Sequence, residues 1–226
     1  MADVVGNLRV VLGEIEKAQR QRGTGEPVTL VAVTKNHGVE LMRQAIDAGV
    51  KQVGENRVQE AAEKFAELER TVTKHLIGHL QTNKAKQAVR LFDLIHSVDG
   101  GHVAAALDKA ALSVGKVQDV LIQVNLAKED SKSGVYEENL PALIEFVDAL
   151  QNLRLRGLML IAPNYSDVEN CRPLFRRMNE IFRAIQSRRE NFDFLSMGMT
   201  HDYKIAVEEG ANVVRVGTAI FGERIY

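Results

Sequence analysis

The sequence has one cysteine and no long apolar run, and each of these shortages excludes a class of protein. A single cysteine, Cys171, rules out an internal disulfide and leaves too few thiols for a cysteine-rich zinc site. No apolar stretch approaches the roughly 20 residues that a membrane-spanning helix needs. Charges at Asp3, Arg9 and Glu14 interrupt any signal-peptide core. We therefore expect a cytoplasmic protein with no membrane partner.

Neither sign of charge dominates the chain. Lysine and arginine number 29 and aspartate and glutamate number 30, which gives a formal net charge of −1. Such a chain lacks the basic surplus typical of nucleic-acid-binding proteins, and we expect no nucleic-acid partner. No segment rich in proline, glycine or serine divides it, so residues 1–226 are expected to form a single domain.

Short β-branched runs alternate with longer segments of helical period. The runs expected to form strands are 29–34, 51–56, 74–79, 94–99, 117–125, 155–161, 194–198 and 212–217. Strands that alternate with helices favour parallel βαβ units. Eight such units predict an α/β fold, a single (β/α)8 TIM barrel, and the helical segment before residue 29 adds an extra N-terminal helix. A doubly wound open sheet is the alternative, but no G-x-G-x-x-G motif follows the first run.

Lys35 ends one of the most apolar of these runs, VAVTK (31–35). In such barrels the active site lies at the carboxyl ends of the strands, where the stem of Lys35 should be partly enclosed. An ordinary lysine is only about 0.1% neutral at physiological pH, and desolvation lowers its pKa and frees the amine as a nucleophile. A Schiff-base lysine is the functional interpretation. A snorkelling lysine that caps the strand is the alternative.

The segment VVRVGTAIFGER (213–224) predicts a phosphate site. Gly217 allows close backbone approach, and Gly217 and Thr218 open a short helix whose N–H groups point toward an anion. Ser196 and Thr200, in SMGMT (196–200), add hydroxyls from the neighbouring loop. Two ordinary glycine-containing turns are the alternative. Because a barrel brings its first and last strands together, a ligand with an aldehyde and a phosphate fits, and pyridoxal 5′-phosphate has both.

Eight ordered motifs resemble the pyridoxal phosphate homeostasis protein family, also called the proline synthetase co-transcribed homologues. They are VAVTK (31–35), VGENRVQE (53–60), HLIGHLQTNKAK (75–86), IHSVD (95–99), DSKSG (130–134), RGLMLIAP (156–163), LSMGMT-x-D (195–202) and VRVGTAIFGER (214–224). The resemblance runs from about residue 29 to 226. It implies one (β/α)8 barrel similar to the N-terminal domain of alanine racemase, with pyridoxal phosphate carried on the first-strand lysine, here Lys35.

The resemblance also implies roles for other residues. Ser196, Thr200, Gly217 and Thr218 match the positions that hold the phosphate. Arg215 matches an arginine near the pyridine nitrogen, and Asn56 and His79 match pocket positions. Thr200 departs from the serine more common in the family but keeps a hydroxyl.

Arg215 bears on whether the protein is a carrier or a catalyst. A permanent cation beside the pyridine nitrogen disfavours ring protonation, and an unprotonated ring is a poorer electron sink. Two-domain racemases take a second base, a tyrosine, from a following β-domain, which a chain ending at Tyr226 is expected to lack. The leading hypothesis is therefore a cofactor carrier or buffer that transfers pyridoxal phosphate to transient apo-enzyme partners.

Two rival functions stay open. One is a single-domain amino-acid racemase dependent on pyridoxal phosphate, and the other is a metabolic barrel that binds phosphate without a cofactor. Lys132, in the charged loop 128–138, is a candidate secondary amine in cofactor transfer.

The histidines show little metal-binding pattern. His75 and His79 are placed on a strand with no acidic partner at ligand spacing, so no metal site is expected. His96 and the remaining histidines are interpreted as surface or loop residues. A barrel enclosed by its own helices needs no partner subunit, and a monomer is expected.

Overall fold

The computed structural model describes residues 3–129 and 131–223. Arg224 and Tyr226, which entered the sequence analysis, lie outside this described part of the chain. Within it, no helix is long and apolar enough to cross a membrane.

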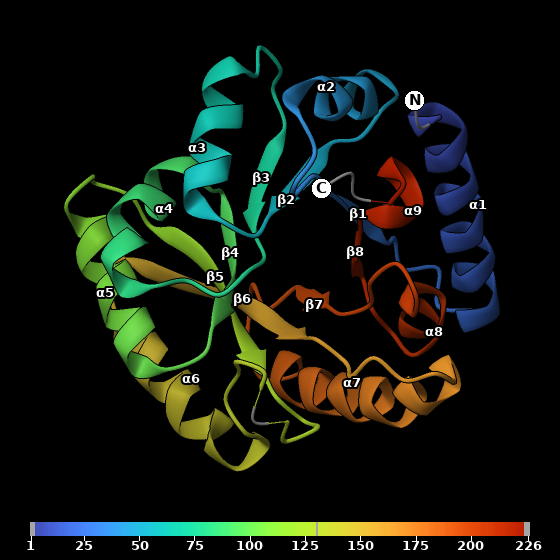
Figure 1. The fold of residues 1–226 in the computed structure, drawn as a ribbon. Helices are drawn as coiled ribbons and strands as arrows, with labels where there is room; N and C mark the ends of the chain where they lie inside the picture. The colour runs from blue at the N-terminus through green and yellow to red at the C-terminus, as the bar shows by residue number, and fades with distance from the viewer. Residues whose placement is uncertain (1–2, 130, 224–226) are drawn as a thin grey trace.

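The strands close into a parallel barrel in the order β1 to β8, and helices surround it (Figure 1). The strands are β1 Thr29–Val33, β2 Gln52–Glu55, β3 Thr73–Leu76, β4 Leu94–Val98, β5 Gln118–Val124, β6 Leu153–Leu160, β7 Phe194–Ser196 and β8 Val213–Val216. The pairing of β1 with β8 completes the ring, with Val31 opposite Arg215. The predicted TIM barrel is confirmed, and the open sheet is excluded.

The helices include the extra one predicted at the N-terminus. They are α1 Val4–Arg22, α2 Val39–Asp47, α3 Val58–Glu67, α4 Ala85–Leu91, α5 Gly101–Leu112, α6 Leu140–Asp148, α7 Arg172–Gln186, α8 Tyr203–Glu208 and α9 Thr218–Phe221, with short 3-10 turns at Thr82–Lys84, Glu137–Asn139 and Val168–Cys171. Each long helix buries one apolar face; in α7 that face includes Phe175, Met178 and Phe182. Periodicity of this kind follows from the 3.6-residue turn.

Helix α1 lies against the last helices of the chain (Figure 1). It buries Leu8, Val11 and Ile15, and the amide Nδ2 of Asn7 donates to the carbonyl of Ile220 in α9 at 3.0 Å. The guanidinium of Arg22 donates to the carbonyl of Ala211 at 2.9 Å. The N-terminal helix thus covers the seam where β1 meets β8.

A bulge interrupts the pairing of β5 with β6. Leu155 pairs with Val120 and Gly157 pairs with Leu121, so Arg156 is the extra residue. Its guanidinium contacts both Asp119 and Asp193. A bulge of this kind bends its strand locally.

Candidate functional site

A cavity of about 370 Å³ opens on the described part of the barrel. That volume lies in the range of small-ligand sites. Six of the predicted site residues line it: Lys35, Asn56, Thr200, Arg215, Gly217 and Thr218. Apolar walls come from Val33, Ile77 and Ile161. The first-strand lysine and the segment after β8 therefore share one cavity, as the closed barrel requires.

Lys35 follows its strand instead of ending it. Strand β1 ends at Val33, and Lys35 lies half-buried in the turn that leads to α2. The next residue, Asn36, has a φ of 61°, in the left-handed region. Asparagine tolerates that region better than most residues. The prediction of a partly enclosed lysine stem fits this placement.

Arg215 is the buried cation of the cavity. It is 3% exposed, and its Nη1 donates to the hydroxyl of Ser196 at 2.5 Å while Nη2 donates to the carbonyl of Leu160 at 2.9 Å. Burial lowers its pKa to about 10, and Asp202 acts in the opposite direction. The guanidinium therefore keeps its charge at neutral pH.

Ser196 belongs to a buried polar chain and is not among the residues lining the cavity. Its Oγ lies 3.0 Å from Nδ1 of His96, and Nε2 of His96 lies 2.8 Å from Nδ1 of His75. Because Arg215 only donates, the serine hydroxyl accepts from Arg215. The direction of the bonds between Ser196 and His96 and between His96 and His75 depends on which ring nitrogens carry a hydrogen. Among the described residues, Nε2 of His75 is buried without a hydrogen-bond partner.

The two histidines are held neutral by burial. Desolvation lowers the pKa of His75 to about 4 and that of His96 well below its ordinary value. His75 and the charge of Arg215 lower the pKa of His96 further. The expectation that His96 is a surface or loop residue is wrong: it lies on β4 and is 0% exposed.

The residues around Gly217 supply hydroxyl and N–H groups. Gly217 caps α9, and its N–H lies 3.4 Å from Oγ1 of Thr200. Thr218 is the first residue of α9, and Asn56, which follows β2, lines the same cavity. Both Thr200 and Thr218 reach solvent, so a ligand could approach them.

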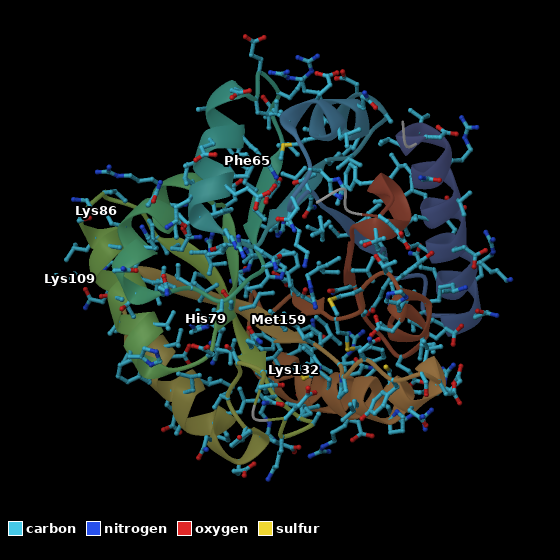
Figure 2. The ribbon with its side chains drawn as sticks, in the orientation of Figure 1. Phe65, His79, Lys86, Lys109, Lys132 and Met159 are labelled. Atoms are coloured by element: carbon cyan, nitrogen blue, oxygen red, sulfur yellow. The ribbon has the colours of Figure 1, made fainter. Side chains whose placement is uncertain are left out.

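His79 and Lys132 are not among the residues that line the cavity. Strand β3 ends at Leu76, and His79 is an exposed loop residue whose Nδ1 lies 3.1 Å from Asp99 and 3.1 Å from Ser133. Nζ of Lys132 donates to the carbonyl of Ala162 at 3.0 Å and pairs with Glu129. Figure 2 shows both residues inside the ring of helices, whereas Lys86 and Lys109 lie at its rim.

Metal ligands do not gather in the part of the chain that the structure describes. Across residues 3–129 and 131–223, no group of three or more His, Cys, Asp or Glu side chains is arranged to hold a metal ion. His75, one of the two histidines considered for such a site, is instead engaged with His96.

Comparisons with known proteins match nearly the whole chain. The family model "Alanine racemase, N-terminal domain" matches residues 15–225. A pyridoxal phosphate homeostasis protein of Aquifex aeolicus is 43% identical over 220 residues, with 96% of each chain covered. The Escherichia coli K12 protein of the same name is 38% identical over 231 residues, which cover 100% of this chain and 99% of that one.

Solved structures agree with this similarity. PipY of Synechococcus elongatus, solved with PLP bound, is 37% identical, has a TM-score of 0.85, and is matched over 97% of this chain and 100% of PipY. An alanine racemase of Clostridium difficile, 16% identical with a TM-score of 0.71, shares the fold over 96% of this chain and 57% of its own. The family match and the full-length relatives lead to one conclusion: this chain belongs to the pyridoxal phosphate homeostasis protein family, whose barrel is that of the alanine racemase N-terminal domain.

Proposed function

We propose that this protein binds pyridoxal 5′-phosphate at Lys35 and acts in intracellular vitamin B6 homeostasis as a carrier or buffer of the cofactor. One observation carries the proposal: Lys35, Arg215 and the Thr200–Gly217 pair line a single cavity. The relatives named for pyridoxal phosphate homeostasis, and PipY with PLP bound, support it.

The residues present fit the chemistry of this cofactor. The Nζ amine of Lys35 would condense with the aldehyde to form a Schiff base, with loss of water. The hydroxyl of Thr200 and the N–H groups at Gly217 and Thr218 suit a phosphate. Asn56 contributes a polar amide to the lining of the cavity. We assign Ser196, which bonds Arg215, to holding the guanidinium in place.

Arg215 favours storage over catalysis. Pyridoxal phosphate in general stabilises carbanions because its ring withdraws electrons when protonated. A guanidinium with a pKa of about 10 stays charged and opposes that protonation near it. Its hydrogen bonds to Ser196 and Leu160 fix the charge in place. We therefore propose a carrier that passes its cofactor to transient apo-enzyme partners, and we expect a monomer.

The central test is reduction of the protein with borohydride after addition of pyridoxal phosphate, followed by peptide mass mapping. We expect a pyridoxyl adduct on Lys35 that is absent from Lys35→Ala. Lys86→Ala, which removes an exposed lysine of α4, serves as the matched control and should keep the adduct. A wild-type protein without an adduct at Lys35 would contradict the proposed attachment.

A second measurement separates the carrier from the racemase. The loaded protein is incubated with L-alanine or L-serine, and the enantiomers are resolved by chiral chromatography. We expect the amino acid to keep its configuration, because Arg215 weakens carbanion stabilisation. Accumulation of the D-enantiomer by wild type, but not by Lys35→Ala, would instead assign racemase activity.

A further inference from the structure

The turn that carries Lys35 is held by hydrogen bonds to both of its neighbours. The carbonyl of Thr34 accepts from Nζ of Lys64 at 2.7 Å, and the N–H of Asn36 donates to Oε1 of Glu60 at 2.5 Å. The hydroxyl of Thr34 also donates to Oε1 of Glu55 at 2.6 Å. The backbone is therefore fixed immediately before and immediately after Lys35.

Lys64 joins these contacts into one cluster. Its ammonium contacts Glu55 at 2.9 Å and Glu60 at 2.6 Å in addition to the Thr34 carbonyl. An ammonium has three donors, so these three acceptors satisfy it. Glu55 lies on β2, whereas Glu60 and Lys64 lie one turn apart on α3. The cluster thus ties α3 and β2 to the turn after β1.

The charged groups of this cluster are buried or half-buried, although their burial contributes little to the free energy of unfolding. The side chain of Glu55 is 0% exposed and that of Lys64 is 11% exposed. Enclosing an ion pair brings little net stabilisation, because the loss of hydration offsets the attraction. The second oxygen of Glu55 is buried and has no hydrogen-bond partner among residues 3–129 and 131–223, which adds to the cost. What the cluster does achieve is a fixed geometry at one turn.

That turn needs external support. Strand β1 has ended at Val33, and Asn36 adopts a left-handed φ of 61°. A non-glycine residue in this region is maintained by the structure around it. If the turn relaxed, the Cα of Lys35 and the direction of its side chain would move with it.

We propose that Lys64, together with Glu60 and Glu55, is a positioning group that fixes the backbone on both sides of Lys35 and so sets where its Nζ reaches into the cavity. The inference rests on the proposed function, because it assigns the cluster to presenting Lys35 to pyridoxal phosphate. None of the three residues is among those lining the cavity, so they act through Lys35.

The experiment compares Lys64→Met and Glu60→Ala with wild type and with Lys86→Met, an exposed lysine on α4 (Figure 2). The first variant removes all three contacts of the ammonium, and the second removes the acceptor for Asn36 together with one of those three contacts. The dissociation constant for pyridoxal phosphate is measured from visible absorbance. The fraction of pyridoxyl adduct on Lys35 after borohydride is mapped by mass, and each melting temperature is recorded.

We expect both cluster variants to weaken binding about tenfold or more, since a small misplacement of a reacting group has effects of that size. The fraction of adduct on Lys35 should fall and that on other lysines rise, whereas Lys86→Met should match wild type. Lys64→Arg, which keeps a cation with several donors, should recover part of the binding. If Lys64→Met does not fold, the dissociation constant and the adduct distribution of Glu60→Ala test the proposal.

Two failures are distinguishable. Wild-type protein without an adduct at Lys35 would overturn the proposed function itself. A wild-type adduct at Lys35, with unchanged dissociation constants and adduct distribution in Glu60→Ala and in folded Lys64→Met, would overturn only the positioning role. A lower melting temperature with unchanged binding would likewise assign the cluster to stability alone.

Discussion

Replacing Gly157 with alanine is expected to destabilise the protein by about 4 kcal/mol or more, the range of exceptional single substitutions. Gly157 has a φ of 153°, and a Cβ there would lie 1.9 Å from the carbonyl oxygen of Phe194. That oxygen is backbone of β7, paired directly with Gly157, so it cannot move aside without separating the two strands. Relief of the clash would therefore open the barrel.

Urea denaturation followed by circular dichroism measures this effect. Gly13→Ala is the matched control, because Gly13 is exposed within α1 and, apart from the adjoining helix backbone, no atom of the described residues lies within 4 Å of a Cβ built there. Alanine at that position should raise the free energy of unfolding by about 0.5–1 kcal/mol, the helix-propensity difference. If Gly157→Ala had the same denaturation midpoint as wild type, this would contradict the prediction and show that β6 and β7 can separate at little cost in free energy.

Acidification is expected to weaken the fold through His75. Its native pKa of about 4 lies below the 6.5 of an unperturbed histidine, so between these values the unfolded chain binds more protons. The contribution of His75 to the free energy of unfolding is therefore fully present above pH 6.5 and falls as the pH drops toward 4. The interval of 6.5 − 4 pKa units corresponds to roughly 3 kcal/mol from this residue alone.

The contribution of His75 is isolated with His75→Gln, whose side-chain amide can either donate to His96 or accept from it. The free energies of unfolding of wild type and variant are compared from pH 7.5 to 4. Their difference should shift in favour of the variant as the pH falls. Burial raises the pKa of both Glu55 and Asp202, which acts in the opposite direction but equally in both proteins. His102→Gln, at an exposed position, should follow the wild-type dependence of the free energy of unfolding on pH. If the curve of His75→Gln also ran parallel to that of wild type, this would contradict the assignment to His75.

The sequence allowed the barrel and much of the cavity to be predicted, because both depend on local patterns. Apolar runs and helical periods mark every βα unit, and in a parallel barrel the residues after the strands must meet at one end. This pattern predicts that Lys35 and Gly217 lie at the same end of the barrel. It placed His79 at the end of a strand, whereas β3 ends at Leu76 and His79 lies exposed in the loop that follows.

Side-chain contacts inside the barrel could not be predicted from such local patterns. His96 and Ser196 are 100 residues apart and meet only inside the closed barrel. A histidine within the run LIHSV carries no mark of whether its ring points inward or outward when the whole strand is buried. In the sequence Glu55 is one polar residue among several at strand ends, and its pairing with Lys64 appears only when α3 packs against β2. Local spacing of Glu60 and Lys64 alone indicates an ordinary helix-surface ion pair.

The covering of the β1–β8 seam by α1 has a consequence for how the chain folds. The pairing of Thr29 with Val213 and the bond from Asn7 to Ile220 join segments close to opposite ends of the chain. Contacts so distant in sequence form late, because each requires closure of a very long loop. Lys35 stands on one side of that seam and Arg215 on the other. A growing chain on the ribosome therefore acquires its cavity only after β8 emerges, so ring closure and the capacity to hold a ligand arise in the same step.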